Sequence, residues 1–263
     1  MAKGHKEWHY VSMDVLLTGI GDAFSNRSYG SSALVHGPEG WIAIDCPGAV
    51  LRAWREAGER SGCMVDPFDV QDIILTHLHG DHCAGLETIG FLHRYKTPSG
   101  VPGPRPRLHA IPAVLERVWE RLAPAMDGRG STMDTYFELC ELSINGVVDI
   151  AGCKVQCRPT RHSVPTAGLL LAADGASLGW SSDSEFDLDH VDWLSSADCI
   201  VHECGEGPKH TTFSELASLP KELRSRIRVL HRPDDAPRVE GDPLLLAEGE
   251  FIQLVGADGH DSH

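Results

Sequence analysis

The chain has 263 residues, 41% of them hydrophobic and 23% charged, which is enough for one large domain with a sizeable core. Asp and Glu number 38 against 23 Lys and Arg, so the formal net charge is -15. A long polyanion such as RNA would be repelled unless a local basic patch compensated. The composition therefore favours a small-molecule substrate and disfavours, without excluding, a nucleic-acid partner.

The sequence carries no evident targeting or membrane signal. Its first residues lack the apolar core of a signal peptide, and no run approaches the roughly 18 apolar residues of a membrane span. We expect a soluble, cytoplasmic protein with no membrane partner.

The eight cysteines are not spaced like a disulfide scaffold, and we expect them to be reduced. Cys153 and Cys157 stand at a spacing that metal sites use, but no second pair completes a zinc ribbon. Two buried thiols are the favoured interpretation, and a Cys-ligated metal is the alternative.

Strands and one helix are predicted for the first part of the chain. Residues 15–17 are typical of a strand, and residues 32–36 and 41–45 of a hairpin. Helical periodicity begins near Val50 and ends by Gly62, and a buried strand is expected at residues 73–75. The Pro- and Gly-rich residues 97–107 are too short a connection to separate independent domains.

The rest of the chain alternates short strands with helices. Helices are predicted at 112–122 and 213–223, and short alternating segments from 133 to 158. Further strands are expected at 108–111, 169–171, 178–180, 199–202, 227–231 and 250–255. Many short strands with interspersed helices indicate an α/β architecture with two packed sheets.

The most informative segment follows the apolar run 72–75. It contains three imidazoles and one carboxylate, at His77, His79, Asp81 and His82. Imidazole nitrogens and carboxylate oxygens are ligands of zinc, manganese and iron. An exposed His-rich loop is the alternative. The four side chains project too differently to bind one ion, so two neighbouring ions with additional ligands are expected.

The additional ligands are expected directly after other predicted strands. His162, Asp183 and His231 each stand at such a position. His202 does so as well and is the main competitor.

This set of residues resembles the pattern of the metallo-β-lactamase superfamily. The motif His-x-His-x-Asp-His is complete at residues 77–82 and is followed by a single His, a single Asp and a last His. Asp45 is similar to the family's early buried Asp that supports the His loop. The resemblance implies an α/β fold, a four-layer αβ/βα sandwich with two mixed β-sheets flanked by helices. It also implies one domain over residues 1–263, with flexible termini and a core at about 14–255.

The resemblance implies a role for each residue. The protein would hold two divalent metal ions. The first would be bound by His77, His79 and His162, and the second by Asp81, His82 and His231. Asp183 would bind both ions. Zinc is the expected ion, with manganese or iron as alternatives. A water or hydroxide would lie between the ions, and Asp81 is counted among the catalytic residues as well as the ligands.

Residues 202–213 are similar to the ribonuclease Z and phosphodiesterase branch of that superfamily. The branch carries a His-Glu pair, here His202-Glu203, and a following His-Thr pair, here His210-Thr211. By this resemblance His210 is the candidate catalytic acid and Glu203 its orienting partner. A strand end and a helix cap are the structural alternative. Only 20 residues, 163–182, separate the single His from the bridging Asp, too few for the arm with which common ribonuclease Z proteins grip transfer RNA.

These features predict a dinuclear metal-dependent hydrolase that cleaves a phosphodiester in a small substrate through a metal-bridging hydroxide. The alternatives are a lactone, thioester or carboxylic-ester hydrolase, a ribonuclease Z-like RNA endonuclease, an iron-loaded redox enzyme and a non-catalytic binding module. Arg27 could contact a substrate phosphate, and Trp180 could wall the metal site unless it packs in the core. Such enzymes often pair, so a homodimer is a further expectation.

Overall fold

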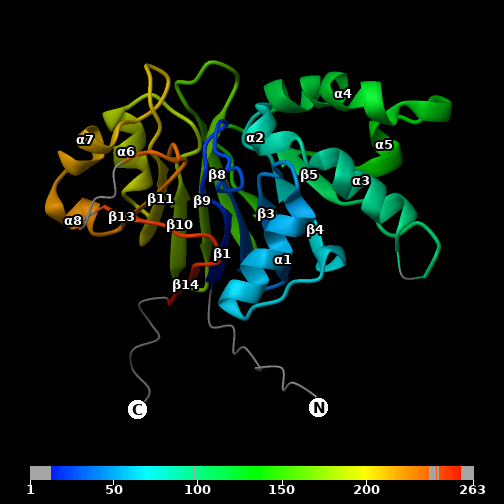
Figure 1. The fold of residues 1–263 in the computed structure, drawn as a ribbon, viewed down its shortest axis with the longest axis horizontal. Helices are drawn as coiled ribbons and strands as arrows, with labels where there is room; N and C mark the ends of the chain where they lie inside the picture. The colour runs from blue at the N-terminus through cyan, green and yellow to red at the C-terminus, as the bar shows by residue number, and fades with distance from the viewer. Residues whose placement is uncertain (1–12, 98, 237–240, 242, 256–263) are drawn as a thin grey trace, which may run out of the picture.

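Two β-sheets face each other at the centre of the molecule (Figure 1). The computed structural model describes residues 13–97, 99–236, 241 and 243–255. Within these residues the first sheet has seven strands in the order β14-β1-β2-β3-β4-β5-β6, and the second has seven in the order β13-β12-β11-β10-β9-β8-β7. The first comprises β1 Met13–Gly19, β2 Ser32–Gly37, β3 Gly40–Ile44, β4 Val70–Ile74, β5 Arg107–Ala110, β6 Glu138–Glu141 and β14 Phe251–Leu254. The second comprises β7 Val148–Ile150, β8 Cys153–Pro159, β9 Ala167–Ala173, β10 Ala176–Trp180, β11 Cys199–Glu203, β12 Ile227–Leu230 and β13 Leu244–Leu245.

Helices cover the outer side of each sheet (Figure 1). Beside the first sheet lie α1 Val50–Ser61, α2 Gly80–Cys83, α3 Leu86–Tyr95, α4 Pro112–Met126 and α5 Met133–Tyr136. Beside the second lie α6 Leu188–Leu194, α7 Phe213–Ala217 and α8 Lys221–Arg224. This arrangement confirms the predicted four-layer sandwich. Among the described residues, no helix combines the length and the apolar character that a bilayer span requires.

Helix α1 shows how local sequence and packing agree. Val50 and Trp54 are buried on the face that packs on β1. The exposed face carries ion pairs one turn apart, such as Arg52–Glu56 at 2.7 Å. The helix ends where Gly62 adopts a left-handed φ of 80°, a conformation that glycine takes without steric cost.

Three predicted elements differ from the structure. The helix expected at 213–223 is two short helices, α7 and α8, because Pro220 between them has no N–H to donate and its ring excludes a continuous helix. Helix α4 extends beyond the expected end at Leu122, to Met126. Residues 133–136 form α5 rather than an alternating segment, and a capping box at Thr132 begins that helix.

The topology brings the carboxyl ends of several strands to one edge of the sandwich. Strands β3 to β6 are parallel neighbours, as are β10 to β12. Asp45 follows β3, the loop with His77 follows β4, Asp183 lies just beyond β10, and His231 follows β12. Ligand sites in α/β folds form at such edges.

Candidate metal centre

The loop that follows β4 is held by a buried carboxylate. Asp45 accepts hydrogen bonds from the Thr76 N–H and from His82 Nδ1, both at 2.8 Å, and from the Thr76 hydroxyl. Because a carboxylate only accepts, His82 Nδ1 carries a proton, and its Nε2 faces the site. Thr76 Oγ1 also contacts His77 Nδ1 at 3.0 Å, which leaves His77 Nε2 turned toward the site.

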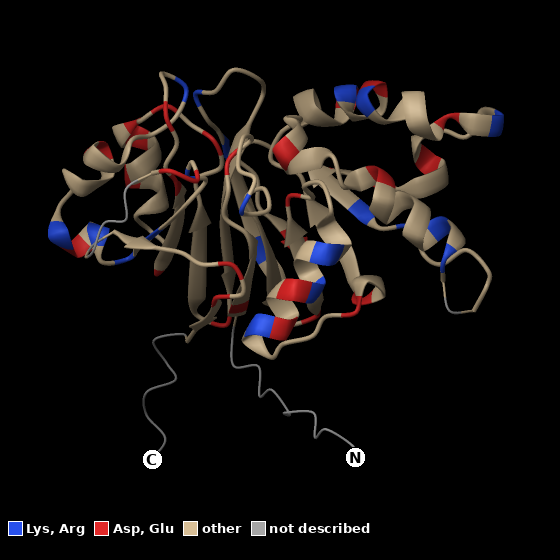
Figure 2. Ribbon diagram, in the orientation of Figure 1, with Lys and Arg blue, Asp and Glu red and all other residues tan. Residues whose placement is uncertain are grey.

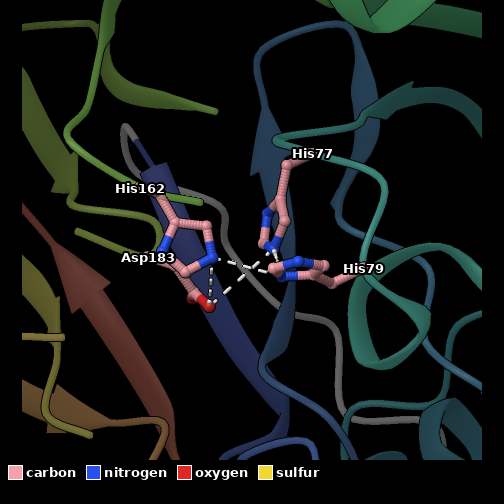
Figure 3. Close-up of side chains that lie close together, drawn as sticks. All are labelled: His77, His79, His162 and Asp183. Atoms are coloured by element: carbon pink, nitrogen blue, oxygen red, sulfur yellow. Dashed lines mark hydrogen bonds and ion pairs between the residues drawn. The ribbon is translucent and has the colours of Figure 1, made fainter. Parts of the chain in front are cut away.

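Three imidazoles from two sides of the site converge beside Asp183 (Figure 3). His79 Nδ1 lies 3.1 Å from both His77 Nε2 and His162 Nε2. The ligand nitrogens of a tetrahedral zinc ion are about 3.3 Å apart. Asp183 Oδ2 completes the group at 3.8 Å from His77 Nε2 and 3.7 Å from His162 Nε2. These four side chains could hold one divalent ion.

A second group lies on the other side of Asp183. Asp81 Oδ2 is 3.3 Å from both His82 Nε2 and His231 Nε2. Asp183 joins this group too, because its Oδ1 lies 3.4 Å from His82 Nε2 and its Oδ2 lies 3.4 Å from His231 Nε2. Asp183 therefore lies between the two groups and within 3.8 Å of a ligand nitrogen in each.

The donor set fits divalent cations. His82 Nε2 is buried and makes no hydrogen bond within the described part of the chain, which is costly unless a ligand satisfies it. Burial raises the pKa of Asp183, but attraction by surrounding imidazoles, chiefly His82 and His231, outweighs burial and holds that pKa well below its ordinary value. Burial lowers the pKa of His77 well below its ordinary value. Burial also lowers the pKa of His82 and His231, but attraction by carboxylates, chiefly Asp183, outweighs burial and raises both above their ordinary values. Metal ions bind ionised carboxylates and neutral imidazoles, so binding at this cluster would displace those protons.

The backbone is strained at three positions around the site. Asp45, Ser182 and His231 adopt left-handed φ angles of 61°, 55° and 58°. This conformation costs a non-glycine residue roughly 1–2 kcal/mol. Each position directly follows or lies close to a strand end, where a sharp turn aims a side chain at the site. The His231 N–H donates to Ile20 O at 2.8 Å, which ties the last turn to the segment after β1.

His210 and Glu203 form a pair beside the second group. Glu203 is buried, and its Oε1 lies 3.1 Å from His210 Nδ1. This hydrogen bond raises the pKa of His210 above its ordinary value. The His210 ring stacks on that of His231 with centroids 5.2 Å apart, so it faces the cluster. The predicted neighbours are therefore in contact.

Five other sequence candidates belong neither to the two ligand groups nor to the cavity at the cluster. His202 Nδ1 contacts the Glu203 carbonyl oxygen at 2.8 Å, and burial lowers its pKa to about 4. Cys153 and Cys157 are buried thiols on β8, and neither belongs to a metal-binding group among the described residues. Trp180 is fully buried in the core. Arg27 lines a neighbouring cavity rather than the one at the cluster.

A cavity of about 550 Å³ opens onto the cluster. Asp183, His210 and His231 contribute to its wall, together with Phe24 and Glu206, to which no function was assigned from the sequence. Both lie in loops whose residues show no periodicity, and only the folded chain brings them to the cavity. Thr76 was also missed, although it adjoins the His motif as the partner of Asp45.

The fold and the cluster together define a metal-dependent hydrolase with the metallo-β-lactamase fold. The fold is shared with the metallo-β-lactamase fold protein YhfI from Bacillus subtilis, with a TM-score of 0.74 and 16% sequence identity. The match covers 91% of this chain and 98% of that one. Within this class, residues 13–255 match the model of the family described as Anti-Pycsar protein Apyc1, and the chain belongs to that family.

Two relatives extend the comparison. The Anti-Pycsar protein Apyc1 of Saccharibacillus brassicae is 28% identical over 240 residues, which cover 87% of this chain and 93% of that protein. The cAMP/cGMP-dependent 3',5'-cAMP/cGMP phosphodiesterase B of Dictyostelium discoideum is 27% identical over 209 residues. That match covers 72% of this chain and 18% of the longer relative.

Proposed function

We propose that the protein is a phosphodiesterase with two divalent metal ions, and that its substrate is a cyclic mononucleotide. The observation that carries this proposal is the position of Asp183. One of its oxygens faces His82, and the other lies 3.4 Å from His231 Nε2 and 3.7 Å from His162 Nε2. A carboxylate between two ligand groups can serve two neighbouring ions at once, which suits two-metal hydrolysis.

The ligand groups assign the residues that would hold each ion. The first ion would be held by His77, His79 and His162, the second by Asp81, His82 and His231, and both by Asp183. When bound, two divalent ions supply a water that ionises near neutral pH and neutralise charge on the phosphate oxygens. Asp45 and Thr76 would keep His82 and His77 in the tautomers that ligation needs.

The cavity supports a small substrate with a single negative charge. None of the described residues that line it is Lys or Arg, whereas Asp22 and Glu206 contribute carboxylates outside the ligand groups. Lys and Arg lie instead on outer helices such as α1, α3 and α4 (Figure 2). Carboxylates at the mouth repel any second phosphate, which favours a cyclic mononucleotide over RNA. The cAMP/cGMP phosphodiesterase activity for which the Dictyostelium relative is named supports the same substrate class.

His210 is positioned to act as the general acid. Its Nδ1 bonds to Glu203, so Nε2 remains for the substrate. In the proposed reaction the oxygen of one water joins phosphorus and one ester P–O bond breaks. The released ester oxygen takes a proton from His210 and becomes a hydroxyl group, which stays on the ribose because the phosphodiester is cyclic. The proton given up by the attacking water returns through solvent to His210, so that the cycle closes.

The test is hydrolysis of 3′,5′-cyclic AMP and cyclic GMP by protein loaded with zinc or manganese, with metal content measured by mass spectrometry. We expect conversion to the nucleoside monophosphate, loss of activity with a chelator, and recovery when metal is restored. Asp183→Asn should lower kcat more than about 100-fold and reduce the bound metal.

Asp192→Asn is the matched control, because it removes the same charge from an exposed position on α6. It should leave activity and metal content unchanged. A panel of lactones, thioesters and carboxylic esters tests the competing chemistry on the same site. A protein that holds two metal ions yet hydrolyses no cyclic nucleotide would contradict the proposed function.

A further inference from the structure

Phe24 is an aromatic side chain that the fold leaves unpacked at the mouth of the catalytic cavity. It is 90% exposed, more than any other large apolar residue described as exposed. It lies on the loop between β1 and β2 and lines the cavity that also includes Asp183 and His210. A lone exposed apolar residue needs no explanation by itself. Phe24 needs an explanation because it lies in the wall of the cavity at the cluster.

The backbone on both sides of Phe24 is held firmly, although its ring is not. The Phe24 N–H donates to Asp22 Oδ1 at 3.0 Å. Ser25 Oγ donates to Asp234 Oδ1 at 2.5 Å, and the Asn26 N–H donates to Asp234 Oδ2 at 2.9 Å. Asp234 lies three residues after His231, so the loop is anchored to the segment that carries a candidate ligand. The backbone that carries the ring therefore lies at a fixed place relative to the cluster.

We infer that Phe24 is the platform on which the nucleobase of the substrate stacks. The inference rests on the proposed function, which places the phosphate at the His/Asp cluster and leaves the base to extend toward the mouth. A base has a flat, uncharged face, and stacking on an aromatic ring suits every base. Because the backbone of the loop is already held in place, little backbone conformational entropy is lost when the ring binds. The carboxylates of Asp22 and Glu206 nearby repel a phosphate but not a neutral base.

The test compares kinetic constants of Phe24→Ala, Phe24→Leu and Phe24→Tyr with those of the wild type, using phosphorus NMR. For cyclic AMP we expect Phe24→Ala to raise KM roughly 5- to 100-fold, the range of base–aromatic stacking, and to keep kcat within about twofold. Phe24→Tyr should restore the wild-type KM, and Phe24→Leu should not. The abasic analogue, in which hydrogen replaces adenine, should be hydrolysed equally by the wild type and Phe24→Ala.

Leu188→Ala is the matched control, because Leu188 is a large apolar residue exposed on α6, away from the cavity. It should leave both constants unchanged. An unchanged KM in Phe24→Ala, full rescue by Phe24→Leu, or an equal loss with the abasic analogue would overturn the inference. Each of these results requires a wild type that hydrolyses cyclic AMP. Absence of that hydrolysis would instead contradict the proposed function.

Discussion

The two halves of the candidate metal centre are built in different ways. The half contributed by the first sheet comes from one loop of six residues, 77–82, directly after β4. The half contributed by the second sheet, His162, Asp183 and His231, comes from three loops that follow three different strands. The first half is largely local in sequence, whereas the second exists only once β8, β10 and β12 are aligned.

Each half has its own buried carboxylate, and the two differ in what they hold. Asp45 bonds to Thr76 and His82, which flank a single loop. Glu203 accepts from the Ser184 N–H at 2.9 Å, which lies in the connection after β10. It also accepts from the Gly205 N–H at 2.8 Å and from His210 Nδ1 at 3.1 Å, which lie in the connection after β11. Asp45 therefore anchors one loop, whereas Glu203 is a hub that joins two connections.

The largest effect on activity is expected from substitution of His210, the side chain that Glu203 holds beside the site. His210→Gln removes the proton donor and should lower kcat for cyclic nucleotides about 10²- to 10⁴-fold. With bis(p-nitrophenyl) phosphate the loss should be much smaller, because p-nitrophenolate departs without a proton. Steady-state kinetics on both substrates provide the measurement. Equal losses on the two substrates would contradict an acid role and leave His210 a structural residue.

Glu203→Gln should have the next largest effect, and it should appear in stability as well as activity. One oxygen that now accepts from backbone N–H groups becomes an NH₂ group, so at least one buried donor loses its partner. We expect the free energy of unfolding to fall by about 3 kcal/mol, measured by urea denaturation. Glu222→Gln, at an exposed position of α8, is the control and should change nothing. If the Glu203→Gln protein were as stable as the wild type, Glu203 would not be the residue that holds these loops together.

The same contrast explains how much of the site the sequence could predict. Residues 77–82 fall in one motif after an apolar run, so that half was predicted almost completely. In the other half, position alone could not separate His202 from His231, since both end strands whose residues are all or nearly all buried. Only the resemblance favoured His231. Within the chain, Phe24 owes its position to Asp234, more than two hundred residues away, and no local pattern reports such a contact.

The fold was predicted on similar terms. Strands β4 and β11 were recognised from short apolar runs, Ile73–Ile74 in β4 and Cys199–Val201 in β11, whose residues are all buried. The prediction of one helix at 213–223 was wrong. The apolar periodicity favoured a continuous helix, but Pro220 interrupts it. Strand β13, with only Leu244 and Leu245, was missed, since two residues show no periodicity.

Asp45→Asn tests the anchor of the first half and should have a smaller effect. Asn tolerates the left-handed φ of 61°, so the backbone should persist. Its amide no longer fixes the His82 proton on Nδ1, and metal affinity should fall about 10- to 100-fold, as for other partners of ligating histidines. Isothermal titration with zinc measures this change, and kcat should recover at saturating metal. Asp174→Asn, an exposed position with a φ of 47°, is the matched control. An unaltered zinc affinity in Asp45→Asn would show that Thr76 alone orients the loop.

Ser182→Gly should have the smallest effect, and it tests whether the second half needs strain at its turns. Glycine relieves a left-handed φ of 55° and removes a buried hydroxyl that has no hydrogen-bond partner within the described residues. The greater flexibility of glycine in the unfolded chain offsets this gain by roughly 0.5–1 kcal/mol. The free energy of unfolding should therefore change by less than about 1 kcal/mol.

Ser182→Val is the informative counterpart, because a β-branched side chain resists the left-handed conformation. It should destabilise the protein by about 2 kcal/mol and shift Asp183 away from the two groups. Thermal unfolding and metal content of both variants provide the measurement. If glycine lowered metal content as much as valine, rigidity at this turn, rather than the angle it imposes, would be what positions Asp183. The dispersed half would then depend on each of its loops separately and not on Glu203 alone.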